Sequence, residues 1–311
     1  MSTHDLPAYA VLHAARSRFE TLRGLRYHLW EWGEPASAGP TSPTLVMVHG
    51  WADVGASFQF AVDALARHEG RLRHVVAPDW RGFGQSANSG SDAYWFADYL
   101  GDLDALIDRV SPDAPVDLLG HSMGGNVVMS YAGARPLRVR RLINLEGFGL
   151  PQTRPEQAPK RLAQWLDDLK MPQGFKGFGS LAEVAARLQA NNPRLGADKA
   201  AWLAPHWAAP DADGRWHVRC DPAHKRVNPM LYRVDEILAT WTAIRAPLLW
   251  VEGELTDLSG WWGARYSKAE FHERLTVVPE LQRHTLGACG HMLHHDQPEA
   301  LAALLAAFLN A

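Results

Sequence analysis

The sequence has little cysteine and no long hydrophobic run. Only Cys220 and Cys289 occur among its 311 residues, and they lie far apart in the chain. Two such cysteines cannot form a disulfide framework, which favours a reducing compartment. The longest segment without a polar residue is 300–309, about half of what a membrane-spanning helix needs. We therefore expect a core helix there and no membrane anchor.

Neither sign of charge predominates, and the amino terminus lacks the features of a leader. Lysine and arginine together number 31 against 34 aspartates and glutamates, so the net charge is −3. This balance offers no electrostatic footprint for a polyanion, and nucleic acid is not an expected partner. The first ten residues include His4, Asp5 and Pro7 and contain neither a basic stretch nor an apolar one. No secretory signal is expected, and the sequence predicts a cytoplasmic protein.

Strand patterns and helix patterns alternate through the first half of the chain. Apolar, β-branched runs that end at glycine or polar residues indicate buried strands at residues 44–50, 74–77, 116–119 and 141–145. Apolar residues at intervals of three and four indicate helices at residues 57–68, 93–110 and 124–134. Strands that alternate with helices predict an α/β fold with a doubly wound, parallel sheet.

The alternation stops near Gly147 and returns near Pro247. Between them the pattern predicts short helices at residues 159–169, 181–190 and 197–207, separated by loops, with no strand. A strand pattern at residues 247–251, another at 283–286 and a helix at 298–309 complete the chain. We therefore expect a core domain made of residues 1–148 and 244–311, with a helical cap of residues 149–243 inserted into it.

The segment 120–125 (GHSMGG) fits the pattern G-x-S-x-G between a predicted strand and a predicted helix. Glycines at positions 120 and 124 allow a sharp turn that presents Ser122 at its tip. This context predicts that Ser122 is a nucleophile.

A serine nucleophile needs a base and an acid that orients the base. Of the 15 histidines, His291 is best placed, in a glycine-containing loop before the last helix. Two carboxylates follow predicted strands and can reach it: Asp257, the first choice, and Glu146. The backbone N–H groups of Trp51 and Met123 are the expected donors to a tetrahedral oxyanion.

The histidines at 291, 294 and 295 match no metal-ligand spacing. No metal site is therefore expected from the sequence.

The chain resembles the α/β-hydrolase superfamily from about Arg26 to its end. Four motifs in order carry this resemblance: His49-Gly50-Trp51, DWRGFGQS at 79–86, GHSMGG at 120–125 and Gly290-His291. The resemblance implies a mostly parallel sheet of eight strands, a helical cap after the sixth strand and no cofactor.

Within this superfamily, the chain is similar to the group of epoxide hydrolases, haloalkane dehalogenases, meta-cleavage-product hydrolases and small esterases. Epoxide hydrolases and dehalogenases use an aspartate nucleophile, so Ser122 disfavours both activities. Relatives usually place the acid three residues after the glycine of its loop. Here Asp257 lies four after Gly253 and Thr256 lies at the usual position, which leaves Glu146 open as the acid.

These features predict a serine hydrolase that cleaves carboxylic esters of small or medium hydrophobic acids through an acyl-enzyme. A C–C bond hydrolase, an amidase or aminopeptidase and an acyltransferase would share the same catalytic residues. A non-catalytic α/β-hydrolase-like binding protein is the alternative from another class. The expected partner is a small hydrophobic ester-like substrate, and the protein is either a monomer or a homo-oligomer.

Overall fold

The computed structural model describes residues 8–311 of the chain. Residues 1–7, which carry most of the argument against a leader, lie outside the described residues. Among those described, no helix is both long enough and apolar enough to cross a membrane. Both cysteines are free thiols, with Cys289 buried and Cys220 half-buried.

A large sheet forms the centre of the molecule. Within residues 8–311 it has eight strands in the order β1-β2-β4-β3-β5-β6-β9-β10. The strands from β4 to β10 run parallel, whereas β2 is antiparallel to both β1 and β4. The predicted α/β fold with a mostly parallel sheet of eight strands is confirmed. The strands are β1 (Arg16–Leu22), β2 (Leu25–Trp32), β3 (Leu45–Val48), β4 (Val75–Pro78), β5 (Val116–His121), β6 (Val139–Leu145), β9 (Leu248–Gly253) and β10 (Leu281–Leu286).

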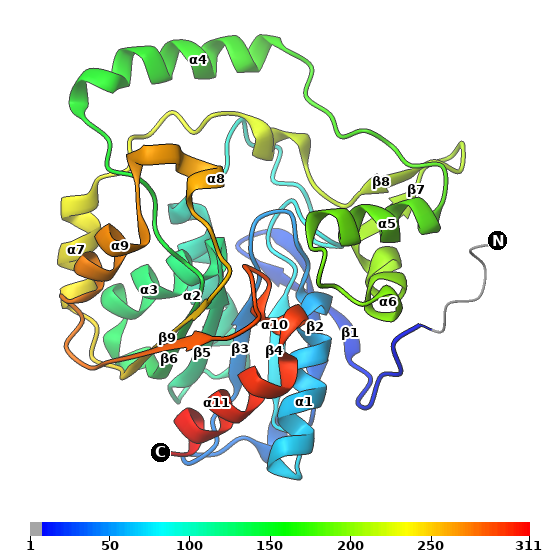
Figure 1. Ribbon diagram of the computed structural model, residues 1–311, viewed down its shortest axis with the longest axis vertical. Helices are drawn as coiled ribbons and strands as arrows, with labels where there is room; N and C mark the ends of the chain where they lie inside the picture. Colours follow the sequence, from blue (N-terminus) through cyan, green and yellow to red (C-terminus); the bar gives the residue numbers. More distant parts are fainter. Residues whose placement is uncertain (1–7) are drawn as a thin grey trace.

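Helices cover both faces of the sheet, which is why its central strands are apolar without alternation. All four residues of β3 and all six of β5 are buried, as expected for parallel strands packed on both sides. One face carries α1 (Gln59–Glu69), α10 (Leu293–Asp296) and α11 (Pro298–Asn310) (Figure 1). The other carries α2 (Phe96–Val110), α3 (Met123–Ala134), α7 (Val234–Thr242) and α9 (Lys268–Leu275).

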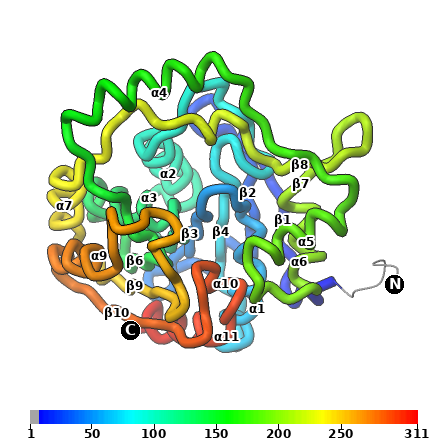
Figure 2. Tube along the Cα trace, turned by 45° about the horizontal axis from the view of Figure 1, so that its top comes forward, coloured from blue at the N-terminus to red at the C-terminus, as the bar shows by residue number. Residues whose placement is uncertain are grey.

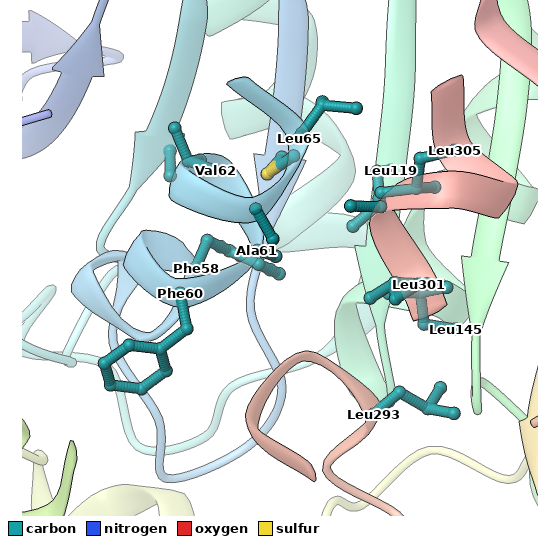
Figure 3. Packing of buried hydrophobic residues seen from close by; sticks show 14 of the residues in the cluster. Phe58, Phe60, Ala61, Val62, Leu65, Leu119, Leu145, Leu293, Leu301 and Leu305 are labelled. Atoms are coloured by element: carbon teal, nitrogen blue, oxygen red, sulfur yellow. The ribbon is translucent and has the colours of Figure 1, made fainter. Parts of the chain in front are cut away.

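The core on the first face forms where two amphipathic helices meet the sheet. Leu65 of α1 and Leu305 of α11 pack in one cluster with Leu119 of β5 (Figure 3). All three side chains are at least 98% buried. Apolar area removed from water is the main stabilising contribution in such a layer, at about 25 cal/mol per Å².

Apart from its last helix, the segment between β6 and β9 lies above the carboxyl ends of the strands (Figures 1 and 2). It contains α4 (Ala158–Lys170), α5 (Leu181–Asn191), α6 (Ala197–Trp207), the strands β7 (Ala208–Pro210) and β8 (Trp216–Val218), and α7. The pair β7–β8 was not expected. Its strands have three residues each and pair with each other, apart from the main sheet. A strand of three residues is too short to show an alternating pattern.

Two helices of the predicted cap have very different surroundings. Helix α4 has no buried residue and arches over the molecule (Figure 1). In contrast, α7 packs closely on α3, because a Cβ atom at Gly133 would lie 2.0 Å from the Thr240 carbonyl oxygen. The division at 149–243 therefore stays a prediction, and packing alone would assign α7 to the core.

Candidate active site

Ser122 lies at a strained turn between β5 and α3. Its φ of 52° and ψ of −115° are unusual for a residue with a side chain, and such strain is concentrated at functional sites. The turn requires glycine on both sides. A Cβ atom at Gly120 would lie 2.3 Å from the Gly124 carbonyl oxygen, and one at Gly124 would lie 2.3 Å from that of Val48. The sequence motif therefore has a steric origin.

The hydroxyl of Ser122 is hydrogen-bonded to His291, a residue 169 positions later. The Ser122 Oγ atom lies 2.9 Å from His291 Nε2. His291 belongs to the loop between β10 and α10, and its side chain is 24% exposed. The ring of Trp261 meets it edge to face, with the centroids 4.5 Å apart. The structure thus brings together the serine and the histidine singled out in the sequence.

The other ring nitrogen of His291 contacts Glu146, the residue directly after β6. Glu146 Oε2 lies 3.0 Å from His291 Nδ1, and Glu146 Oε1 accepts a hydrogen bond of 2.6 Å from the Gly253 N–H. The Glu146 side chain is fully buried. Because a carboxylate only accepts hydrogen bonds, this contact requires that Nδ1 carry the proton and leaves Nε2 as the acceptor facing Ser122.

Asp257, the first choice from the sequence, is not brought to His291. Its carboxylate accepts hydrogen bonds of 2.8 Å and 2.6 Å from the N–H and the hydroxyl of Ser259, at the start of α8 (Ser259–Trp262). The bonds from Ser259 lower the pKa of the Asp257 carboxyl. Asp257 is exposed and makes no hydrogen bond to His291 within residues 8–311. The preference for Asp257 is corrected on this geometry, because the Asp257 carboxylate bonds to Ser259 and Glu146 is the acid that contacts His291.

The loop after β3 runs beside the nucleophile. A Cβ atom at Gly50 would lie 3.0 Å from Ser122 Cβ. The N–H groups of the next residue, Trp51, and of Met123, the first residue of α3, make no hydrogen bond in the described part of the chain. The Trp207 Nε1–H donates to the Ala52 carbonyl at 2.7 Å and fastens this loop to α6. Free N–H groups at a helix start favour a negative oxygen.

His121 supports the loop of His291 from behind. Burial lowers the pKa of its imidazole well below the usual value, so the ring is neutral. His121 Nε2 lies 2.8 Å from the His291 carbonyl oxygen. Since a carbonyl only accepts, Nε2 carries the proton and donates it to this bond. His121 thus faces the backbone of His291.

A buried polar cluster lies next to this site and includes two further histidines. Ser57 Oγ lies 3.0 Å from His294 Nε2 and 2.6 Å from His295 Nε2. Asp53 Oδ2 lies 3.8 Å from His294 Nε2. Among the described residues, Asp53, His294 and His295 are the group whose spacing can hold a metal ion. Hydrogen bonds to Ser57 already account for both imidazole Nε2 atoms, so the cluster is interpreted as a hydrogen-bond network.

Ser122 lies between two cavities. One of about 570 Å³ is lined by Phe96, Phe148 and Trp262, and one of about 400 Å³ by Leu203 and Trp207. Trp51, Trp261 and His291 border both. Space on two sides of one hydroxyl allows a substrate with two arms to reach it, which suits attack on the bond that joins them.

The sequence reasoning missed the aromatic pair Trp261 and Trp262. Both residues line the larger cavity, and they lie on the four-residue helix α8. Two adjacent tryptophans shortly after the carboxyl end of a predicted strand were a usable signal. Trp207, at the end of α6 in the predicted cap, lines the smaller cavity.

Comparisons with known proteins agree with the fold. A family model described as the alpha/beta hydrolase fold matches residues 43–298. The 3-hydroxybutyrate-oligomer hydrolase of Cupriavidus necator is 30% identical over 250 residues, which is 76% of this chain and 78% of that protein. A serine hydrolase-like protein of Danio rerio is 24% identical over 90% of this chain and 86% of that protein. A thioesterase domain from the curacin biosynthetic pathway superposes with a TM-score of 0.81 and 26% identity, over 94% of this chain and 99% of that domain.

Proposed function

The chain belongs to the α/β-hydrolase family and is a hydrolase, and from this premise we propose that it is a serine hydrolase that cleaves carboxylic esters of small or medium hydrophobic acids. One observation carries the proposal. Ser122, His291 and Glu146 form an unbroken series of hydrogen bonds that ends in a buried carboxylate. Such a series turns a weakly nucleophilic hydroxyl into an effective nucleophile.

In the proposed reaction, Ser122 Oγ attacks the ester carbonyl while His291 Nε2 takes the hydroxyl proton. The carbonyl oxygen becomes negative and accepts hydrogen bonds from the Trp51 and Met123 N–H groups. As the tetrahedral intermediate collapses, the bond to the alcohol oxygen breaks and His291 gives its proton to that oxygen. Glu146 stabilises the imidazolium form of His291 between these steps.

The acyl-enzyme is then hydrolysed by the same groups. His291 removes a proton from a water molecule, which attacks the acyl carbon, and the proton returns to Ser122 Oγ as the free acid leaves. Removing one donor to the oxyanion costs roughly 3 kcal/mol of barrier in a comparable site. We therefore expect the hydrogen bonds from the Trp51 and Met123 N–H groups to lower the activation barrier substantially.

The lining of the cavities supports an apolar acyl or alcohol group. Phe96, Phe148, Trp261 and Trp262 border the larger cavity, and aromatic side chains supply most of the apolar contact in small-molecule sites. Two of the similar proteins are named as a hydrolase of hydroxybutyrate oligomers and as a thioesterase. Both names support cleavage at an acyl carbon.

A series of p-nitrophenyl esters from acetate to laurate tests the proposal, with the Ser122→Ala variant beside the unmodified protein. We expect hydrolysis with a preferred acyl length and none above background in the variant. Labelling by a fluorophosphonate is the second measurement. If folded protein gives no adduct at Ser122 and no ester is cleaved, the enzyme is not a serine hydrolase. If Ser122 is labelled while every ester resists, the ester assignment fails and C–C or amide bonds become the candidates.

A further inference from the structure

A third cavity, of about 840 Å³, adjoins the larger cavity beside Ser122. The two share Leu150 and Trp262 in their walls. The third cavity is bordered by the segment after β6, by the beginning of α4 and by the residues that follow α8. A molecule held with its carbonyl at Ser122 can therefore extend past Trp262 into this space.

The charges that line the third cavity are unbalanced. Arg154, Arg161 and Arg265 border it together with a single acid, Glu156. Within residues 8–311, none of these three guanidinium groups forms an ion pair with a carboxylate. Two of them are held by backbone contacts, since Arg161 donates to the Asn228 carbonyl at 3.3 Å and Arg265 to that of Trp262 at 3.2 Å. In the described part of the chain, these three positive charges border the cavity without an ion-pair partner.

Some arginines elsewhere in the chain do pair with acids. Arg81 is buried and pairs with Asp102, and Arg140 pairs with Asp117 at 2.6 Å. The whole chain has a net charge of −3, so the positive cavity is a local feature. A concave wall of one charge sign concentrates the electric field and attracts ligands of the opposite sign.

Positively charged residues also predominate in a cavity on the opposite side of Ser122. A cavity of about 550 Å³ shares Trp51 and Trp207 with the smaller cavity beside Ser122. Lys176, Arg187 and Lys225 border it, with Glu183 as the acid. Positive charge thus lies at both outer ends of the space that leads to Ser122, whereas several tryptophans and phenylalanines line the two cavities next to Ser122.

We propose that the ester cleaved at Ser122 carries an anionic group, a carboxylate or a phosphate, which the arginines at 154, 161 and 265 bind. This inference rests on the proposed ester hydrolysis and names its substrate class. A guanidinium offers N–H donors in a fixed fork that matches the oxygens of carboxylates and phosphates. The aromatic cavity holds the apolar middle of the substrate and the arginines hold its charged end.

The test uses pairs of esters that differ only in charge. p-Nitrophenyl monoesters of dicarboxylic acids from adipate to sebacate are compared with the same compounds whose free carboxylate is methylated. We expect kcat/KM to favour the charged member by roughly tenfold at low salt, mainly through KM, because charge-assisted hydrogen bonds are worth more than neutral ones. The preference should appear only beyond a certain chain length and should decline as salt is added.

Variants show whether the arginines cause the preference. The triple variant Arg154→Gln, Arg161→Gln, Arg265→Gln should lose most of the ratio between charged and methylated ester, and Arg265→Gln alone should lose part of it. Arg245 is exposed, forms no ion pair in the described chain and lines none of these cavities. Arg245→Gln should therefore keep the full ratio. An unchanged ratio in the triple variant, or a preference for the methylated esters, would overturn the inference.

Binding to the Ser122→Ala variant separates this inference from the proposed reaction. We expect it to bind monomethyl sebacate more tightly than dimethyl sebacate by calorimetry, and the triple arginine change should remove the difference. Failure of hydrolysis with this difference intact would count against the ester reaction alone. Equal binding of the two compounds would count against the anion site. Octyl phosphate in the same assay distinguishes a phosphate site, which it would occupy more tightly than monomethyl sebacate, from a carboxylate site.

Discussion

The Glu146 carboxylate lies 3.0 Å from His291 Nδ1, although 145 residues separate the two positions. Glu146 has a positive φ of 59°, is buried, and receives a second hydrogen bond from the Gly253 N–H. The first bond orients the imidazole and the second orients the carboxylate. Because a buried carboxylate is costly unless it is hydrogen-bonded, these two contacts satisfy the Glu146 side chain and hold it directed at His291.

The two candidate acids are separated by the variants Glu146→Gln and Asp257→Asn. An amide at position 146 keeps the shape of the side chain but removes the charge that stabilises the imidazolium, so we expect kcat to fall by about 10³ to 10⁴. The Asp257→Asn change removes an exposed charge that contacts Ser259, and kcat should stay within about twofold. Equal losses in the two variants, measured with the best p-nitrophenyl ester, would contradict the assignment of Glu146.

The sequence could predict the elements around Ser122 because their signals are local. An apolar run that ends in glycine indicates β5, and the steric need for glycine at positions 120 and 124 appears directly as a motif. The choice between Glu146 and Asp257 could not be predicted in this way. Both follow strands that end at the same edge of the sheet, and what separates them is the burial of Glu146 between β6 and β9.

Short helices and helices with little packing set another limit on what the sequence can predict. The spacing of apolar residues predicts α4 correctly, but α4 has no buried residue, so a pattern that normally indicates a core face did not tell how the helix is placed. Helix α8 has four residues and carries Trp261 and Trp262 to the site. A single helical turn has no periodicity to detect, and its position depends on contacts made after the chain has folded.

Replacing Gly124 by alanine should disrupt the turn that presents Ser122. The added Cβ atom would lie 2.3 Å from the Val48 carbonyl oxygen and 2.7 Å from that of His49, both backbone atoms that cannot rotate away. We expect the free energy of unfolding to fall by about 2 to 4 kcal/mol, as in severe overpacking, together with a loss of esterase activity. Urea unfolding measures the first effect.

Gly174→Ala is the matched control for this change. Nothing lies within 4 Å of a Cβ atom at position 174, and its φ is not positive. The variant should unfold within about 0.5 kcal/mol of the unmodified protein. If both alanine variants behaved alike, close packing at position 124 would not explain the motif.

The hydroxyl of Ser57 should contribute more to stability than its size suggests. It lies within hydrogen-bonding distance of both His294 Nε2 and His295 Nε2, and all three residues are at least 97% buried. Ser57→Ala leaves polar ring atoms without a partner, which costs about 1 to 3 kcal/mol for each unsatisfied group. Chemical denaturation of the variant should show a loss in this range.

Ser130→Ala provides the comparison for Ser57→Ala. Ser130 is also buried, but its hydroxyl bonds to the Asn126 carbonyl within α3, at 3.1 Å. A carbonyl in a helix already accepts a backbone hydrogen bond, so this loss should cost little, within about 0.5 kcal/mol. A Ser57→Ala variant as stable as Ser130→Ala would show that the histidine cluster does not depend on the hydroxyl.

Stability should fall as the pH drops below about 6.5, the ordinary pKa of histidine. Burial lowers the pKa of five histidines in the folded protein: His49, His121, His206, His224 and His295. These rings bind protons more readily in the unfolded chain, so unfolding takes up protons and becomes more favourable in acid. For His224, whose pKa burial lowers to about 4, the loss extends from pH 6.5 down to about pH 4.

The contribution of His224 to this pH dependence can be measured separately. Its ring is stacked between Phe83 and Tyr94, with centroids 3.9 Å and 3.7 Å away, so another aromatic ring can replace it. His224→Phe keeps an aromatic ring there and removes the titrating group. The free energy of unfolding should then change less between pH 6 and pH 5, by about 1 kcal/mol per pH unit. Tyr99→Phe removes only a hydroxyl that lies 3.3 Å from His224 Nδ1, and it should lower stability without changing the slope. A slope that stays the same in His224→Phe would show that His224 gains its proton as readily in the folded protein as in the unfolded chain.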